Sequence, residues 1–138
     1  MPSRLLRRGG DFTVVTYGIN VNDALKAADV LKAEGIDISV LKLDFIKPID
    51  FDAVTERARN TGGILVLEEC SSADCVGTAI AAHFEENGIE PERFILRNLG
   101  DRFIPHGAVA RLREEYGIDA AGIAKDIKGA LGYGKEKA

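Results

Sequence analysis

The sequence has little of what several large classes of protein depend on. It contains no tryptophan, two cysteines and one methionine, and aromatic residues make up only 7% of its 138 residues. So few aromatic side chains disfavour a surface on which the bases of single-stranded nucleic acid stack. No stretch of 18 or more apolar residues occurs, so we expect no transmembrane helix and no membrane partner.

The two cysteines carry no sign of an extracellular or metal-binding protein. Residues 1–10 are basic but lack the apolar core and cleavage site of a secretory signal. We therefore expect a reducing, cytoplasmic setting in which Cys70 and Cys75 are ordinary thiols. A zinc site needs about four ligands, and neither His83 nor His106 lies at ligand spacing from the cysteines. The sequence predicts no metal site.

The composition favours one folded domain. Apolar residues make up 46% of the chain, which is too high for a disordered protein, and 138 residues is the length of a typical single domain. With 18 basic and 22 acidic residues the net charge is −4, which disfavours nucleic-acid binding. We predict a single domain over residues 1–138, with the polar residues from about 132 to 138 as a flexible tail.

The pattern of apolar residues alternates between strand and helix along the chain. β-Rich or fully apolar runs predict strands over residues 12–17, 37–45, 64–67 and 93–96, and residues 4–7 are a candidate antiparallel edge strand. Apolar residues at helical spacing predict helices over residues 21–34, 51–58, 76–87, 108–116 and 120–131. Strands separated by helices favour right-handed crossovers and a mostly parallel sheet. The predicted fold is a three-layer α/β/α domain.

Residue types at the helix ends predict where several helices begin and end. Asn20 and Asp50 are placed as N-caps of the first two helices. Gly35 and Gly88 are placed where the first and third helices stop, because glycine adopts the left-handed conformation common after a helix.

The carboxyl ends of parallel strands predict where a functional edge lies. Neither G-x-G-x-x-G nor a P-loop motif is present there, which weakens nucleotide-binding interpretations. Glu68 and Glu69 directly follow the buried run 64–67. They are either an acid–base pair, if burial raises one pKa, or structural groups that cap a helix or pair with an arginine, and we favour the second.

Other chemistry-bearing residues give weaker signals. His83 falls on a helix face with Ala79, which is typical of a packed or surface histidine. His106 lies in a turn and is freer to contact a partner. Phe103 and Ile104 in the loop 100–107 must be buried either in the domain's own core or in a partner. No G-x-S-x-G is present to indicate a serine hydrolase.

The loop at residues 100–107, Gly-Asp-Arg-Phe-Ile-Pro-His-Gly, also carries a family resemblance. Together with residues 112–123 it is similar to the C-terminal domain of 1-deoxy-D-xylulose-5-phosphate synthase, and more broadly to the transketolase C-terminal domain. Residues 13–18, 43–49 and 66–69 agree with the same family in the same order. The resemblance extends over roughly residues 6–131.

The resemblance implies a fold and a context. The family's fold is a five-stranded mixed sheet with an antiparallel first strand and helices on both faces. The parent enzymes are two-carbon transferases that bind thiamine diphosphate and Mg²⁺ between their first two domains, across a dimer interface. Their C-terminal domain supplies packing and dimer contacts, so no catalytic or cofactor-binding residue is implied in this chain. The implied partners are the cofactor-binding domains or subunit and a second copy of the chain.

The resemblance also implies a docking surface, in which Phe103 is the apolar anchor and charged neighbours position it. Its six candidate residues are Glu68, Glu69, Asp101, Arg102, Phe103 and His106.

Two departures from the family pattern fall beside this surface. Asp74 and Cys75 stand where the family has Gly-Gly, although Gly77 is retained, and Gly100 stands where the family has proline.

Three interpretations of the function follow. The leading one is a C-terminal domain or section of a transketolase-like enzyme that is not catalytic alone, either as an excised domain or as one subunit of a split enzyme. The first alternative is a stand-alone interaction or regulatory module on the same fold. The second is a small-ligand binder at the carboxyl edge of the strands.

Overall fold

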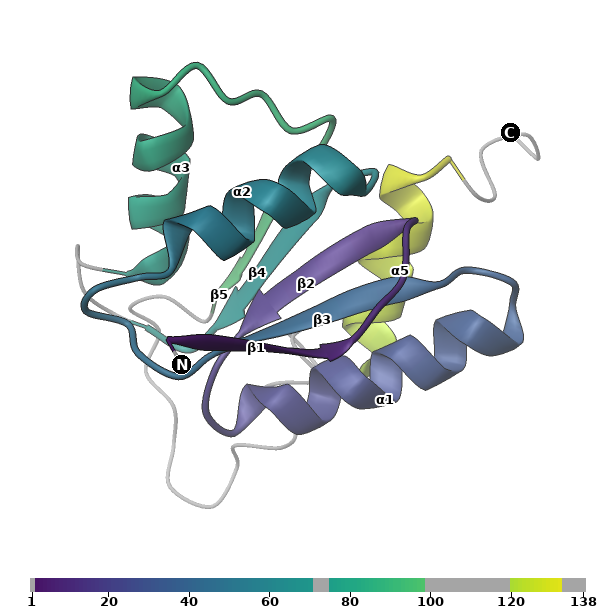
Figure 1. The fold of residues 1–138 in the computed structure, drawn as a ribbon. Coiled ribbons are helices and arrows are strands. Elements are labelled where there is room, and N and C mark those ends of the chain that lie inside the picture. Colours follow the sequence, from purple (N-terminus) through teal and green to yellow (C-terminus); the bar gives the residue numbers. More distant parts are fainter. Residues whose placement is uncertain (1, 71–74, 99–119, 133–138) are drawn as a thin grey trace.

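The sheet has five strands, and its order differs from the order of the strands in the sequence. The computed structural model describes residues 2–70, 75–98 and 120–132 (Figure 1). Its elements are β1 (Ser3–Arg7), β2 (Phe12–Thr16), α1 (Asn20–Ala33), β3 (Ile38–Leu43), α2 (Phe51–Asn60), β4 (Ile64–Glu68), α3 (Val76–Glu86), β5 (Phe94–Asn98) and α5 (Ala120–Ala130). The spatial order is β1-β3-β2-β4-β5. β1 is antiparallel to β3 and the other pairs are parallel, which confirms the predicted mixed sheet.

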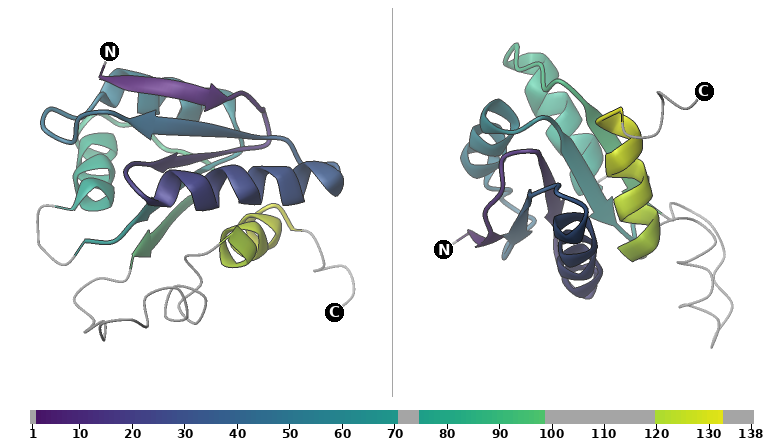
Figure 2. Two further views of the ribbon diagram at one scale, coloured as in Figure 1. Left: turned by 90° about the horizontal axis from the view of Figure 1, so that it is seen from below. Right: turned by 90° about the vertical axis from the view of Figure 1, so that its right-hand side faces the viewer.

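Helices cover both faces of the sheet. α1 and α5 lie on one face and α2 and α3 on the other (Figures 1 and 2). Every residue of the neighbouring strands β2 and β4 is buried, as expected for strands covered on both sides. Neighbouring residues of a strand face opposite sides, so Val14 packs in the α1–α5 core with Ile123, and Val15 packs in the α2–α3 core with Ile80. The predicted three-layer architecture is confirmed.

β1 closes one edge of the sheet, as the candidate edge strand at residues 4–7 predicted. Ser3 pairs with Leu43 in antiparallel register, and the register shifts between Leu5 and Arg7. A register irregularity on an edge strand discourages pairing with another chain. At the turn into β2, the Ser39 hydroxyl donates to the Gly9 carbonyl at 2.6 Å and fastens the turn to β3.

The helix ends show which capping predictions were right. Asp50 is confirmed as the N-cap of α2, because its Oδ1 accepts from the Ala53 amide at 3.2 Å. Gly35 and Gly88 adopt φ of 84° and 66° just beyond α1 and α3, also as predicted. The Asn20 prediction is wrong by one residue. The helix includes Asn20, and its N-cap is Ile19, which makes no side-chain capping bond.

Backbone geometry explains the shifted start of α1. The Val21 amide donates to the Gly18 carbonyl at 3.3 Å, and Gly18 adopts φ of 64°. This glycine turn starts the helix without a polar cap, and a residue with a side chain is disfavoured at that conformation. The predicted helix over residues 108–116, the loop with Phe103 and Ile104, and most of the predicted tail lie outside the described residues. Within the described ranges, no helix is both long and apolar enough to span a bilayer.

Candidate docking site at the carboxyl edge of the sheet

The chain segments that follow β2, β3 and β4 meet at one end of the sheet. The three strands are parallel neighbours, so their carboxyl ends point the same way, and the segments after Thr16, Leu43 and Glu68 gather there (Figure 1). This carboxyl edge is where the sequence predicted functional residues. α1, α2 and α3 all begin at the same end of the sheet.

Glu68 is the polar centre of the carboxyl edge. It is the last residue of β4, and only 2% of its surface is exposed. One carboxylate oxygen, Oε1, accepts from the Val76 amide at 3.1 Å, and the other, Oε2, accepts from the Gly77 amide at 2.7 Å. These amides belong to the first turn of α3, where N–H groups lack helical partners and the helix dipole favours a negative charge. Glu68 therefore caps α3 from a different element.

Tyr17 completes the set of donors to this carboxylate. Its hydroxyl, just after β2, donates to Oε1 of Glu68 at 2.8 Å. Burial, and secondly the hydrogen bond to Glu68, raise the pKa of the Tyr17 phenol well above its usual range. Tyr17 is thus a neutral donor at any physiological pH. Nearby, the Thr16 hydroxyl donates to the Leu67 carbonyl at 2.9 Å and ties β2 to β4 at the same level.

Gly77 is required for this capping arrangement. A Cβ atom at this position would lie 2.9 Å from Oε2 of Glu68 and 2.7 Å from the Leu96 side chain. Both contacts are closer than real Cβ atoms tolerate. The carboxylate reaches the helix amides only because residue 77 has no side chain, which gives the glycine retained from the family pattern a physical reason.

The two cysteines form a disulfide, and the prediction of free thiols is wrong. Cys70 follows β4 closely and Cys75 is the N-cap residue of α3, and their Cα atoms are 5.8 Å apart, within the range that a disulfide needs. The bond ties the end of a central strand to the start of a helix. Sequence spacing alone did not show that the two side chains meet.

The disulfide and the hydrogen bonds of Glu68 argue against a metal site at Glu68, Cys70 and Cys75. Side-chain atoms of Glu68, Cys70 and Cys75 lie within 4.8 Å of one another, which is close enough to share an ion. However, the two sulfurs are bonded to each other, and both oxygens of Glu68 already accept hydrogen bonds. The positive end of the α3 dipole also repels a cation. In this disulfide form the cluster is structural.

Three large apolar side chains that the sequence analysis did not select are exposed at the carboxyl edge. Ile19 follows β2 and is 65% exposed, and Phe45 and Ile46 follow β3 and are 55% and 45% exposed. Ile46 also lines an open groove of about 440 Å³, together with residues that include Pro48, Phe51 and Ala79. The sequence did contain a signal for these residues, because bulky apolar side chains are unusual in a surface loop. We applied that argument only to Phe103 and Ile104.

The structure describes two of the six predicted docking residues, Glu68 and Glu69. Glu68 and Glu69 lie at the carboxyl edge, and Glu68 is engaged as a structural acceptor. The other four candidate docking residues, Asp101, Arg102, Phe103 and His106, lie outside the described residues. His83 is a packed helix histidine, as expected, and its ring stacks on Phe51 with centroids 4.1 Å apart.

The comparison with known families agrees with this architecture. The sequence profile described as "Transketolase, C-terminal domain" matches residues 3–123. The chain belongs to the transketolase C-terminal domain family. The observed fold, with its antiparallel first strand, is therefore that of a transketolase C-terminal domain.

Individual relatives are similar along most of this domain. The chain is 40% identical over 123 residues to 1-deoxy-D-xylulose-5-phosphate synthase from Heliobacterium modesticaldum, covering 88% of this chain and 18% of the relative. It is 36% identical over 124 residues to 1-deoxy-D-xylulose-5-phosphate synthase 1 from Geobacter metallireducens, covering 90% of this chain and 20% of the relative. The chain thus spans about a fifth of the length of these relatives.

Solved structures show the same fold. A split-gene transketolase, described as an inactive beta4 tetramer, matches with a TM-score of 0.81 and 33% identity, over 95% of this chain and 42% of that one. A transketolase from Pichia stipitis matches with a TM-score of 0.63 and 18% identity, over 96% of this chain and 18% of that one. The second match supports the fold alone.

Proposed function

We propose that this transketolase C-terminal domain is the assembly domain of a thiamine-diphosphate-dependent enzyme similar to 1-deoxy-D-xylulose-5-phosphate synthase. It packs against the cofactor-binding domains and against a second copy of the chain, and it carries out no chemistry alone. The proposal draws on the synthase relatives, which share 36–40% identity with nearly all of this chain but are about five times longer.

The observation that carries the proposal is the apolar character of the carboxyl edge. Ile19, Phe45 and Ile46 are each at least 45% exposed, and all three follow parallel strands of one sheet. Phe45 and Ile46 are neighbours in the chain, and exposed bulky apolar side chains that lie next to each other mark an interaction site. The groove beside Ile46 extends this apolar surface toward α3.

We assign the six residues of the predicted docking surface to the same interface. Phe103 is its apolar anchor, and the charged residues fix the orientation of the partner. Glu68 is buried, so it contributes by holding Tyr17 and the start of α3 in place. The remaining members of the surface are Glu69, Asp101, Arg102 and His106.

The described residues do not fit thiamine diphosphate itself. A Mg²⁺ diphosphate group needs several free oxygen ligands and donors to its phosphate oxygens. At the carboxyl edge, both oxygens of Glu68 accept hydrogen bonds from the protein, and the sulfurs of Cys70 and Cys75 are bonded to each other. We therefore assign cofactor binding to the parts of the longer relatives that lie outside their match with this chain.

Self-association without activity has a parallel among the relatives. The split-gene transketolase at 33% identity is described as an inactive beta4 tetramer. By analogy, we propose that this chain associates with itself and remains inactive until it meets the cofactor-binding domains.

A domain exchange tests the proposal. The test replaces the segment of the Heliobacterium modesticaldum synthase that aligns with this chain, 18% of its length, by the chain itself. We expect the chimera to dimerise and to convert pyruvate and glyceraldehyde 3-phosphate in the presence of thiamine diphosphate and Mg²⁺. In the chimera, Phe45→Asp combined with Ile46→Asp should abolish dimerisation and activity together, because it charges the apolar edge.

The matched control is Val30→Asp, which charges an equally exposed apolar residue (46%) on α1. It should leave the chimera dimeric and active. Loss of assembly in both variants, or in neither, would contradict the role of the carboxyl edge. Calorimetric binding of thiamine diphosphate by the isolated chain would contradict the assignment of cofactor binding to the other domains.

A further inference from the structure

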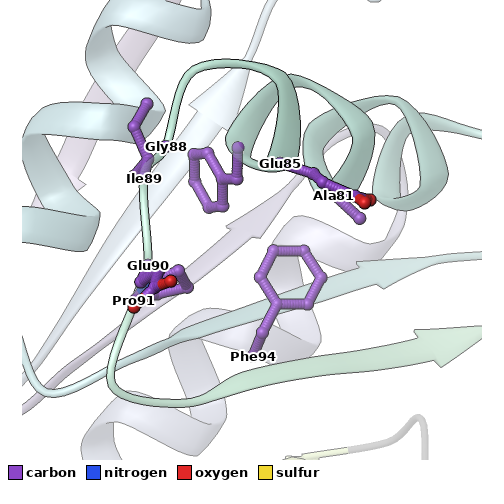
Figure 3. A pocket seen from close by; sticks show the side chains of 8 residues that line it. Ala81, Glu85, Gly88, Ile89, Glu90, Pro91 and Phe94 are labelled. Carbon is purple, nitrogen blue, oxygen red and sulfur yellow. The ribbon is translucent and has the colours of Figure 1, made fainter.

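A second groove lies at the opposite end of the sheet from the carboxyl edge. It is about 500 Å³ in volume and runs between the end of α3 and the start of β5 (Figure 3). We call it the α3–β5 groove and define it by Phe84, Glu85, Ile89, Glu90, Pro91 and Phe94. Phe94 is the first residue of β5 and pairs with the first residue of β4, which places the groove at the amino ends of these strands.

The backbone at the end of α3 holds the groove in one shape. Gly88 adopts φ of 66°, its amide donates to the Glu85 carbonyl at 3.4 Å, and the Ile89 amide donates to the Phe84 carbonyl at 2.8 Å. This pair of bonds is the Schellman arrangement that satisfies the last carbonyls of a helix. The groove walls are therefore fixed by hydrogen bonds rather than left as a loose loop.

The floor of the groove is aromatic. The rings of Phe84 and Phe94 meet edge to face, with centroids 5.8 Å apart and an angle of 87°. Figure 3 shows the Phe94 ring pointing from β5 toward α3, with Pro91 on the connection beside it. Phe84 is 3% exposed, whereas Phe94 is only half-buried. Phe94 thus offers an apolar surface to a ligand that enters from solvent.

The rim of the groove is acidic. Glu85 lies on the α3 side and Glu90 on the connection to β5, and both are exposed. In the part of the chain that the structure describes, neither forms an ion pair, and the nearby Arg93 is paired with Glu92 at 3.1 Å. Glu85 also lies in the last turn of α3, where the helix dipole is negative and disfavours an acidic side chain. Arg59 lines the adjoining hollow that shares Ile89, Glu90 and Pro91, but within the described residues it forms no ion pair with either glutamate, so both remain able to pair with a cation of a ligand.

We propose that the α3–β5 groove docks a segment of a partner protein that carries one bulky apolar side chain flanked by Lys or Arg. The apolar side chain packs on Phe94 and Pro91, and the basic side chains pair with Glu85 and Glu90. A cation that sits over the face of the Phe94 ring gains a further attraction. This site is separate from the carboxyl edge, and the proposal does not rest on the assembly role.

Selection of peptides against the full chain tests the proposal directly. We expect a random peptide library to yield sequences with Leu, Ile, Phe or Met beside Lys or Arg. Amide chemical shifts of Glu85, Glu90 and Phe94 should move when such a peptide is added. Raising the salt from 0.1 M to 0.5 M should weaken binding, because exposed charges are screened.

Charge reversal provides the decisive comparison. Glu85→Lys combined with Glu90→Lys should weaken a selected basic peptide by about tenfold, since two exposed attractions become repulsions. The same variant should select acidic peptides from the library instead. Glu86→Lys is the matched control, because Glu86 lies in the same turn of α3 but does not line the groove. It should keep the affinity within about twofold of the original.

Three outcomes would overturn the proposal. One is a library that yields no apolar-basic sequences, and another is a selected peptide whose affinity is equal in the original chain and the double variant. The third concerns the chain's own tail, residues 133–138, which contains a tyrosine and two lysines. If ending the chain at Gly132 shifts the Phe94 resonances, the tail rather than a partner occupies the groove. Because none of these experiments measures assembly or enzyme activity, their failure would leave the proposed function standing.

Discussion

The Tyr17 hydroxyl and the Glu68 carboxylate are joined by a hydrogen bond of 2.8 Å, although 51 positions separate them in the sequence. Tyr17 follows β2 and Glu68 ends β4, so the bond forms only when the two strands are paired in register. The same carboxylate caps α3. The start of a helix on one face of the sheet therefore depends on the correct pairing of two central strands.

Tyr17→Phe should lower the free energy of unfolding at neutral pH by about 1–3 kcal/mol. The change removes one donor from a buried carboxylate, and a charged acceptor that loses a partner costs that order of free energy. Urea denaturation followed by circular dichroism measures the effect. A variant as stable as the original chain would show that Glu68 is adequately satisfied by the two helix amides.

The stability of the chain should fall at high pH through Tyr17. The folded state raises the pKa of Tyr17 above its unfolded value of 10.0. The contribution of the protonated phenol is therefore fully present below pH 10 and is lost progressively as the pH rises above it. Between pH 8 and pH 11 the original chain should lose more stability than Tyr17→Phe. Equal losses would mean that Tyr17 does not contribute to the alkaline transition.

Glu68→Ala should destabilise the domain by about 2–4 kcal/mol. It leaves the Val76 and Gly77 amides and the Tyr17 hydroxyl without their acceptor, and it removes a negative charge from the start of α3. Glu86→Ala, at the exposed opposite end of the same helix, is the control and should change stability by less than about 0.5 kcal/mol. Chemical denaturation of both variants under the same conditions makes the comparison.

Two glycine-to-alanine changes should have opposite signs. At Gly77 an added Cβ meets the Glu68 carboxylate and Leu96 at under 3.0 Å, so Gly77→Ala should destabilise by about 1–3 kcal/mol. At Gly129, within α5, an added Cβ meets no atom of another segment within 4 Å, so Gly129→Ala should stabilise by up to about 1 kcal/mol. Thermal unfolding of the two variants checks the signs, and destabilisation by both would argue against a specific contact at Gly77.

Reduction of the Cys70–Cys75 disulfide should destabilise the domain without unfolding it. The bond closes a short loop, and the loop-entropy estimate for so small a ring is about 2 kcal/mol. Denaturation with and without a phosphine reductant gives the difference, and thiol titration of the unfolded protein confirms the oxidised and reduced states. The double variant Cys70→Ser with Cys75→Ser should match the reduced chain and should not respond to the reductant.

Much of the fold was predictable because it depends on local patterns. The apolar run at residues 64–67 predicted β4, and apolar residues at helical spacing predicted α1. Asp50 and Gly88 were placed correctly because an N-cap carboxylate and a left-handed glycine act on residues three or fewer positions away. The family resemblance added the mixed sheet with its antiparallel first strand, which the structure bears out.

The candidate site was less predictable because its contacts join distant segments. The sequence showed that Glu68 follows a buried strand, but not that both of its oxygens are engaged by Tyr17 and α3. It suggested free thiols, whereas Cys70 and Cys75 are joined in a disulfide. The exposure of Phe45 was also missed, because burial depends on what packs over a residue rather than on its type.

By itself, the sequence determined the order and type of the described elements, since these follow from apolar periodicity and residue preferences within a few positions. Only the tertiary structure decided which polar groups are engaged and which apolar groups are exposed. Glu68 and Ile19 show the contrast, since the charged residue is 2% exposed and the apolar one 65%. Strand pairing and helix packing, which link positions far apart in the chain, set both values.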